Sequence, residues 1–140
     1  MTNTSKGTQA APEAMKVQDP STRSSAQLAH DIGDLILDKK GEDLCVIDVE
    51  KVTTLAKLIV IATGRSRRQV VSMAEEVHRF AKRKGFTIVS EEGNDQGWWL
   101  LVDFGDVIVH LMQQEAREYY NLEMLWGDGN VVRRVETPEA

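Results

Sequence analysis

Two apolar runs joined by a short glycine-containing turn constrain the fold of this chain most. Residues 98–103 read WWLLVD and residues 106–112 read DVIVHLM, with Phe104 and Gly105 between them. Apolar runs of this length around a two-residue turn that contains glycine predict a β-hairpin. All three tryptophans and both tyrosines lie between residues 98 and 126. Because these residue types most often anchor interfaces, we expect any recognition surface to lie in this stretch.

The rest of the chain predicts helices and strands in the order of a layered α/β domain. A capping-box spacing predicts one helix from Ser24 to about residue 38 and a second from Ser66 to about residue 84. Short apolar runs predict three further strands, at residues 44–49, 58–62 and 86–89. With the hairpin and a final helix, these elements predict an α/β (α+β) fold with a single mixed five-stranded sheet and helices packed on it.

The distribution of charge is more informative than the net charge of −5. An acidic chain is unsuited to binding nucleic acid in general, so we expect no direct nucleic-acid contact beyond proximity to a larger complex. Between residues 91 and 128 there are nine acidic residues and a single base, Arg117. A solvated face is one reading of this bias. The other is an acidic, aromatic surface suited to a basic partner.

The two ends of the chain differ from its middle. Residues 1–23 are polar without apolar periodicity and are predicted to be a disordered tail, and residues 128–140 a flexible one, around a domain at residues 24–127. No apolar run is long enough to span a membrane, and no secretory signal is recognised. A lone cysteine, Cys45, excludes an internal disulfide. These features predict a cytoplasmic protein without membrane contact.

A small metal-dependent nucleotidyl- or phosphoryl-transfer enzyme is the alternative from another functional class. Asp103 and Asp106 flank the hairpin turn and could hold a divalent cation. The spacings of a phosphate-binding loop, a dinucleotide fingerprint and a nucleophile elbow are all missing. We therefore predict no catalytic residue, no metal ligand and no cofactor.

Alternation along the hairpin divides its side chains between two faces. One face is uniformly apolar and is expected to meet the helices. The other mixes aromatic, aliphatic and acidic side chains, as recognition surfaces do, and comprises Trp99, Leu101, Asp103, Asp106, Ile108 and His110. The final helix could instead cover this face, and the sequence alone leaves both readings open.

A set of short motifs, in a fixed order, resembles a known family. They are Asp48-Val49, Val60-Ile61-Ala62-Thr63-Gly64 with Ser66, Arg68 and Val70, Glu92-Gly93, Trp99, the run from Val102 to His110, Arg117, Tyr120, Leu122-Glu123 and Leu125-Trp126. Between residues 26 and 126 the chain resembles the ribosomal silencing factors, also called the Iojap family. It departs from the family pattern at Lys57-Leu58, where an acidic residue is usual, and at Phe104, where tyrosine is common.

This resemblance implies a mixed-sheet fold related to nucleotidyltransferases but without their catalytic apparatus. It also implies binding to the large ribosomal subunit through the universal large-subunit protein fourteen, which prevents the small subunit from joining and represses translation when nutrients are short. A homodimer is left open. The partner-binding residues implied by the resemblance are Trp99, Leu101, Asp103, Phe104 and Asp106.

Overall fold

The structure is a computed structural model that describes residues 20–93 and 97–137. The first half of the described chain comprises α1 (Pro20–Asp38), β1 (Glu42–Asp48), β2 (Leu58–Gly64) and α2 (Arg67–Lys84). The second half comprises β3 (Ser90–Glu92), β4 (Trp99–Asp103), β5 (Val107–Gln113), α3 (Gln114–Tyr120), α4 (Leu122–Leu125) and β6 (Asn130–Val135). Among the described residues, no helix is both long and apolar enough to cross a membrane.

All six strands form one mixed sheet in the order β3-β4-β5-β2-β1-β6. The central pair, β2 and β5, is parallel, and every other neighbouring pair is antiparallel. Every residue of β2 is buried, as its unbroken apolar run predicts for a strand covered on both faces. The mixed-sheet α+β class predicted from the sequence is confirmed.

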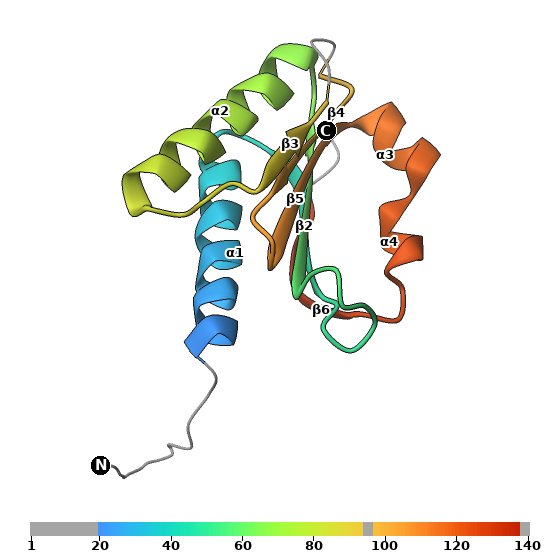
Figure 1. Ribbon diagram of the computed structural model, residues 1–140. Helices are drawn as coiled ribbons and strands as arrows, with labels where there is room; N and C mark the ends of the chain where they lie inside the picture. The colour runs from blue at the N-terminus through green and yellow to red at the C-terminus, as the bar shows by residue number, and fades with distance from the viewer. Residues whose placement is uncertain (1–19, 94–96, 138–140) are drawn as a thin grey trace, which may run out of the picture.

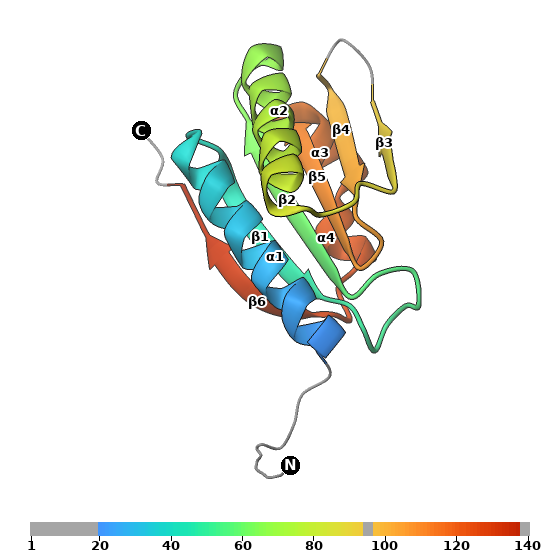
Figure 2. The ribbon, with the colours of Figure 1, turned by 60° about the vertical axis from the view of Figure 1, so that its left-hand side comes forward.

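The sheet is the middle of three layers. The long helices α1 and α2 lie on one face, and the short helices α3 and α4 lie on the other (Figures 1 and 2). Each face has its own apolar cluster. The cluster under α1 and α2 includes Val102, Val107, Val109 and Leu111 of the hairpin, which confirms that the uniformly apolar face of the hairpin meets these helices. The cluster under α3 and α4 includes Ile59, Ile61 and Met112.

The prediction of five strands was wrong, because β6 lies inside the segment 128–140 that was predicted to be a flexible tail. Local sequence gives little sign of this strand, since two adjacent arginines interrupt its three valines and leave no regular alternation. Contacts with distant segments hold it instead. It pairs with β1 along its length, and Arg133 donates to the Asp34 carboxylate of α1 at 2.7 Å.

Two other boundaries differ from the prediction. Helix α1 begins at Pro20 rather than Ser24, consistent with the tolerance of proline in the first turn of a helix. The rest of the predicted N-terminal tail lies outside the described residues. The third strand forms at residues 90–92 rather than 86–89, because Phe86 and Ile88 pack against the helix-side cluster instead of entering the sheet.

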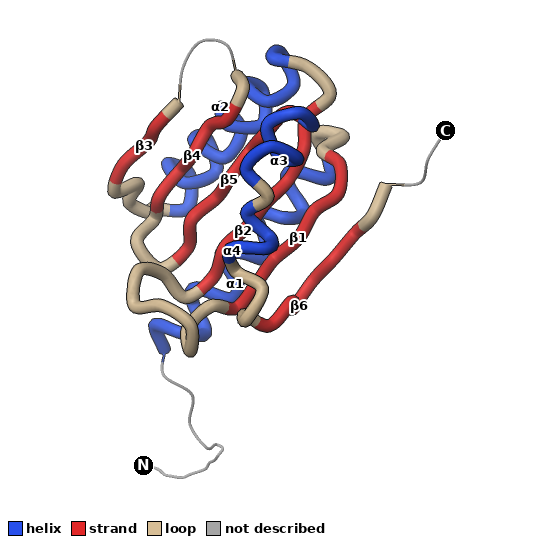
Figure 3. The backbone as a smooth tube through the Cα atoms, turned by 90° about the vertical axis from the view of Figure 1, so that its right-hand side faces the viewer, coloured by secondary structure: helices blue, strands red, loops and turns tan. Residues whose placement is uncertain are grey.

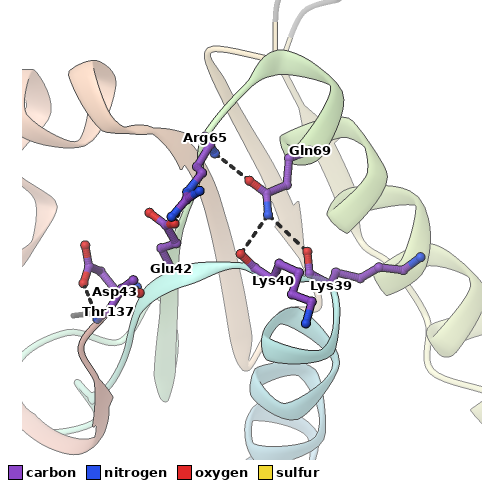
Figure 4. Close-up of polar contacts among 7 residues, drawn as sticks. All are labelled: Lys39, Lys40, Glu42, Asp43, Arg65, Gln69 and Thr137. Carbon is purple, nitrogen blue, oxygen red and sulfur yellow. Dashed lines mark hydrogen bonds and ion pairs between the residues drawn. The ribbon is translucent and has the colours of Figure 1, made fainter. Parts of the chain in front are cut away.

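Helix α2 begins and ends as the sequence predicts. The Ser66 side chain accepts a hydrogen bond from the Gln69 backbone N–H at 3.1 Å, and Gly85 takes the left-handed conformation after the last turn, with φ of 79°. The Gln69 side-chain amide also donates to the carbonyls of Lys39 and Lys40, at 3.1 and 2.8 Å (Figure 4). This amide therefore ties the first turn of α2 to the end of α1.

Candidate partner-binding surface

The β4–β5 hairpin carries the candidate surface. In its register Leu101 lies opposite His110, and Asp103 lies opposite Ile108. Trp99, Leu101 and Asp103 of β4 therefore lie on the same face of the sheet as Ile108 and His110 of β5. This is the face on which α3 and α4 lie. These two helices run over the central strands and leave β4 beside them (Figure 3). The expectation that a final helix covers this face thus holds for the centre of the sheet and not for the part that β4 forms.

Trp99 is half-buried and held on two sides. Its indole N–H donates to Nδ1 of His110 at 3.0 Å. Its ring centroid lies 4.5 Å from that of Tyr120, at the end of α3, and tilts by 46° against it. The tryptophan that the resemblance places at the centre of partner binding is therefore fixed in orientation by a strand residue and a helix residue.

His110 lies in the floor of this face with 6% of its surface exposed. Burial lowers the pKa of His110 from its ordinary value of 6.5 to about 4, and the nearby Asp103 carboxylate acts weakly in the opposite direction. The imidazole is therefore neutral at pH 7. Since an indole N–H can only donate, Nδ1 of His110 is the unprotonated nitrogen and its proton is on Nε2.

Leu101 and Ile108 give the surface an accessible apolar centre. Both are half-buried, whereas Val102 and Val109 on the opposite face are buried. The difference arises because α1 and α2 cover the opposite face, while α3 and α4 do not reach Leu101. A half-covered aliphatic pair beside an oriented tryptophan is the kind of composition found at the centres of protein interfaces.

The structure separates the two predicted acidic residues. Asp103 uses Oδ1 to accept the Gly105 backbone N–H at 2.7 Å, which stabilises the turn. Asp106 uses Oδ2 to accept the Ser25 hydroxyl of α1 at 3.1 Å, so its carboxylate faces the long helices. Placing Asp106 on the same face as His110 was wrong, because strand alternation begins only at Val107.

Phe104 also lies apart from the hairpin face. Its side chain packs against the cluster under α1 and α2, so it supports the turn from the opposite side of the sheet. Of the five residues implied by the resemblance, Trp99, Leu101 and Asp103 share one face, while Phe104 and Asp106 are at the turn and face α1 or the core beneath it.

The two carboxylates named in the enzyme alternative make separate contacts. Asp103 and Asp106 are engaged with different groups, a turn N–H and a helix hydroxyl. Across residues 20–93 and 97–137, no three His, Cys, Asp or Glu side chains gather in a position to hold a metal ion. The two carboxylates are thus accounted for by turn formation and helix packing.

Arg117 is a residue whose role the sequence did not suggest. It is 8% exposed, and its guanidinium donates to the Asp43 carbonyl at 2.6 Å and to the Thr63 hydroxyl at 2.9 Å. It also forms an ion pair with Glu123 at 2.6 Å. Arg117 thereby joins α3 and α4 to the start of β1 and to the end of β2. In the sequence, Arg117 stood out as the lone base of an acidic segment and as one of the residues that carry the family resemblance.

The fold and this surface define a class: a small α+β domain whose candidate site is an acidic, aromatic face of a mixed sheet. Residues 22–140 match the family model described as ribosomal silencing factor during starvation. A ribosomal silencing factor of Chromobacterium violaceum is 46% identical over 90 residues, which cover 64% of this chain and 74% of the relative.

Two further comparisons extend this result. A crystal structure of a Chromobacterium violaceum protein aligns with a TM-score of 0.69 and 36% identity, covering 85% of this chain and 90% of that one. A mouse protein named mitochondrial assembly of ribosomal large subunit protein 1 is 36% identical over 95 residues, which cover 66% of this chain and 42% of the relative. The chain belongs to the ribosomal silencing factor family.

Proposed function

We propose that this protein binds the large ribosomal subunit through the universal large-subunit protein fourteen and sterically prevents the small subunit from joining. Translation is thereby repressed when nutrients are short, and the protein acts in the cytoplasm. The observation that carries the proposal is the family match over residues 22–140, supported by the mouse relative whose name refers to the large ribosomal subunit.

The hairpin face is suited to this role. Trp99 is oriented and partly accessible, and tryptophan truncation at an interface centre typically has the largest effects on affinity. Leu101 supplies adjoining apolar area, and Asp103 contributes negative charge toward a basic partner. We propose that the protein acts by occupying a surface and carries out no catalysis, since its carboxylates serve turn and helix contacts.

Two adjacent tryptophans provide a matched test. Trp99 lies on the proposed surface, whereas its neighbour Trp98, which is 37% exposed, precedes β4 and is not one of the residues of that surface. Each would be replaced by alanine in the full chain, and binding to isolated large subunits would be measured by co-sedimentation in sucrose gradients. We expect Trp99→Ala to weaken binding by about thirtyfold or more and Trp98→Ala to leave it nearly unchanged.

Subunit-joining assays and thermal melting on the same preparations complete the test. Because Trp99 also contacts His110 and Tyr120, the affinity of Trp99→Ala is interpreted only at temperatures where melting shows it to be folded. Leu101→Ser provides a second variant with a smaller structural role. If folded Trp99→Ala and Leu101→Ser proteins both still blocked joining, the proposed surface would be rejected.

A further inference from the structure

Helices α3 and α4 carry apolar side chains on their outer side as well as on their inner side. Inward, Ala116 and Leu122 are buried against the sheet. Outward, four large side chains remain in solvent, which we call the outer ridge: Tyr119 at 79% exposed, Tyr120 at 44%, Met124 at 76% and Leu125 at 66%. The inner residues supply the burial that packs these helices, so folding alone does not explain this concentration of exposed apolar surface.

The exposed charges that α3, α4 and the turn after them carry are all acidic, and the exposed base beside them is Arg134 of β6, which lines a hollow with Glu118 and Asn121. Glu115, Glu118 and Asp128 are exposed. The one base between residues 113 and 129 is Arg117, which turns inward and pairs with Glu123. The outer side of α3 and α4 is therefore apolar and acidic, with no exposed base along that stretch.

The outer ridge is continuous with the hairpin face. The ring of Tyr120 lies 4.5 Å from that of Trp99 and 5.0 Å, edge to face, from that of Tyr119. From there the chain runs directly into α4, which follows α3 down the same face of the sheet (Figure 3). A partner that covers Trp99 is thus placed beside Tyr120 of the ridge.

We propose that the outer ridge is a second part of the partner-binding surface, contacted by the same partner as the hairpin face. The proposal rests on the proposed function. The partner face that fits is a protein surface with an apolar centre and a basic rim. An RNA backbone would be repelled by these carboxylates. A second copy of this chain, docked ridge to ridge about a twofold axis, would bring Glu115 and Glu118 against their own equivalents.

The test replaces the two most exposed aliphatic residues of the ridge together. In the full chain, Met124→Ser/Leu125→Ser is expected to weaken co-sedimentation with isolated large ribosomal subunits by roughly tenfold or more, because accessible apolar anchors are lost. Its fold should be unaffected, which circular dichroism and melting would establish. Tyr119→Ser, at the other end of the ridge, provides an independent variant. Val132→Ser is the control. Val132 is 52% exposed on β6, the edge strand at the end of the sheet away from β3 and β4.

Two results would overturn the inference. One is wild-type affinity for both ridge variants. The other is a wild-type dimer in sedimentation velocity that the ridge variants convert to a monomer without loss of subunit binding, which would assign the ridge to a second copy. A wild-type chain that fails to bind large subunits rejects the proposed function itself. That outcome is distinguished from the others because it is seen before any variant is made.

Discussion

The indole of Trp99 donates its hydrogen bond to the nitrogen of His110 that lies nearer to the backbone, Nδ1, over 3.0 Å. This single contact couples the accessible aromatic ring of the hairpin face to a buried titratable group in the next strand. A proton added to His110 would have to go to Nδ1, where it would compete directly with the indole N–H. The orientation of Trp99 thus depends on His110 remaining neutral.

His110 should make the protein less stable in mild acid. Its folded-state pKa of about 4 is below the ordinary value of 6.5, so the unfolded chain takes up this proton first as the pH falls. The stability present above pH 6.5 is lost between pH 6.5 and 4, by roughly 2–3 kcal/mol at pH 4.5. His110→Gln lacks this titration. Urea unfolding at pH 7.5 and 4.5 should show a smaller drop in the free energy of unfolding for the variant than for the wild type. Equal drops in the two proteins would contradict the lowered pKa of His110.

Arg117 should be essential for stability, unlike an arginine in a surface pair. Arg117→Met leaves Glu123 and two backbone or hydroxyl acceptors without their donor, and loss of a buried pair typically costs about 3–5 kcal/mol. Arg79→Met is the control, since Arg79 pairs with Glu76 while 58% exposed, and such solvent-exposed pairs contribute little to stability. Denaturant unfolding measures how much stability each of the two variants loses. Similar losses in the two variants would show that the Arg117 contacts are not stabilising.

Removal of β6 should destabilise the whole domain. A chain ending at Gly129 loses the strand that pairs with β1, and with it the Arg133–Asp34 ion pair and the two hydrogen bonds between Thr137 and Asp43. We expect a much lower melting temperature and a smaller cooperative transition. A chain ending at Thr137 is the control and should melt as the full chain does. If both truncations melted alike, β6 would contribute nothing to stability.

The cap of α2 should be measurable by itself. Ser66→Ala removes the hydroxyl that accepts the Gln69 N–H, and replacement of such caps by alanine typically costs about 1 kcal/mol. Ser72→Ala, in the middle of the same helix, should change stability by less, because alanine has the higher helix propensity. A larger loss from Ser72→Ala than from Ser66→Ala would argue against the capping role.

The features that the sequence predicted depend on residues close together in the chain. The features that it missed depend on residues far apart in it. The limits of α2 follow from neighbours along the chain, Ser66 at one end and Gly85 at the other, and were predicted correctly. The β4–β5 hairpin likewise follows from adjacent runs. Strand β6 is fixed by β1 and by Asp34, both distant in the chain, so its short and irregular local sequence does not reveal it.

The candidate site shows the same limit at the level of single side chains. Alternation correctly placed Trp99, Leu101 and Asp103 together, because all three lie within one strand. It failed at Asp106, where the strand has not yet begun and a helix hydroxyl determines the direction of the carboxylate. The contact of Trp99 with Tyr120 could not be predicted either, since it depends on how α3 folds back over the sheet.

The pairing of β1 with β6 also affects how the protein is made. Strand β1 is synthesised well before residues 130–135, which pair with its outer edge. While those residues are still inside the exit tunnel, the nascent chain exposes an open strand edge, a site at which other chains can pair. The sheet therefore gains this edge strand only after its other five strands have been made.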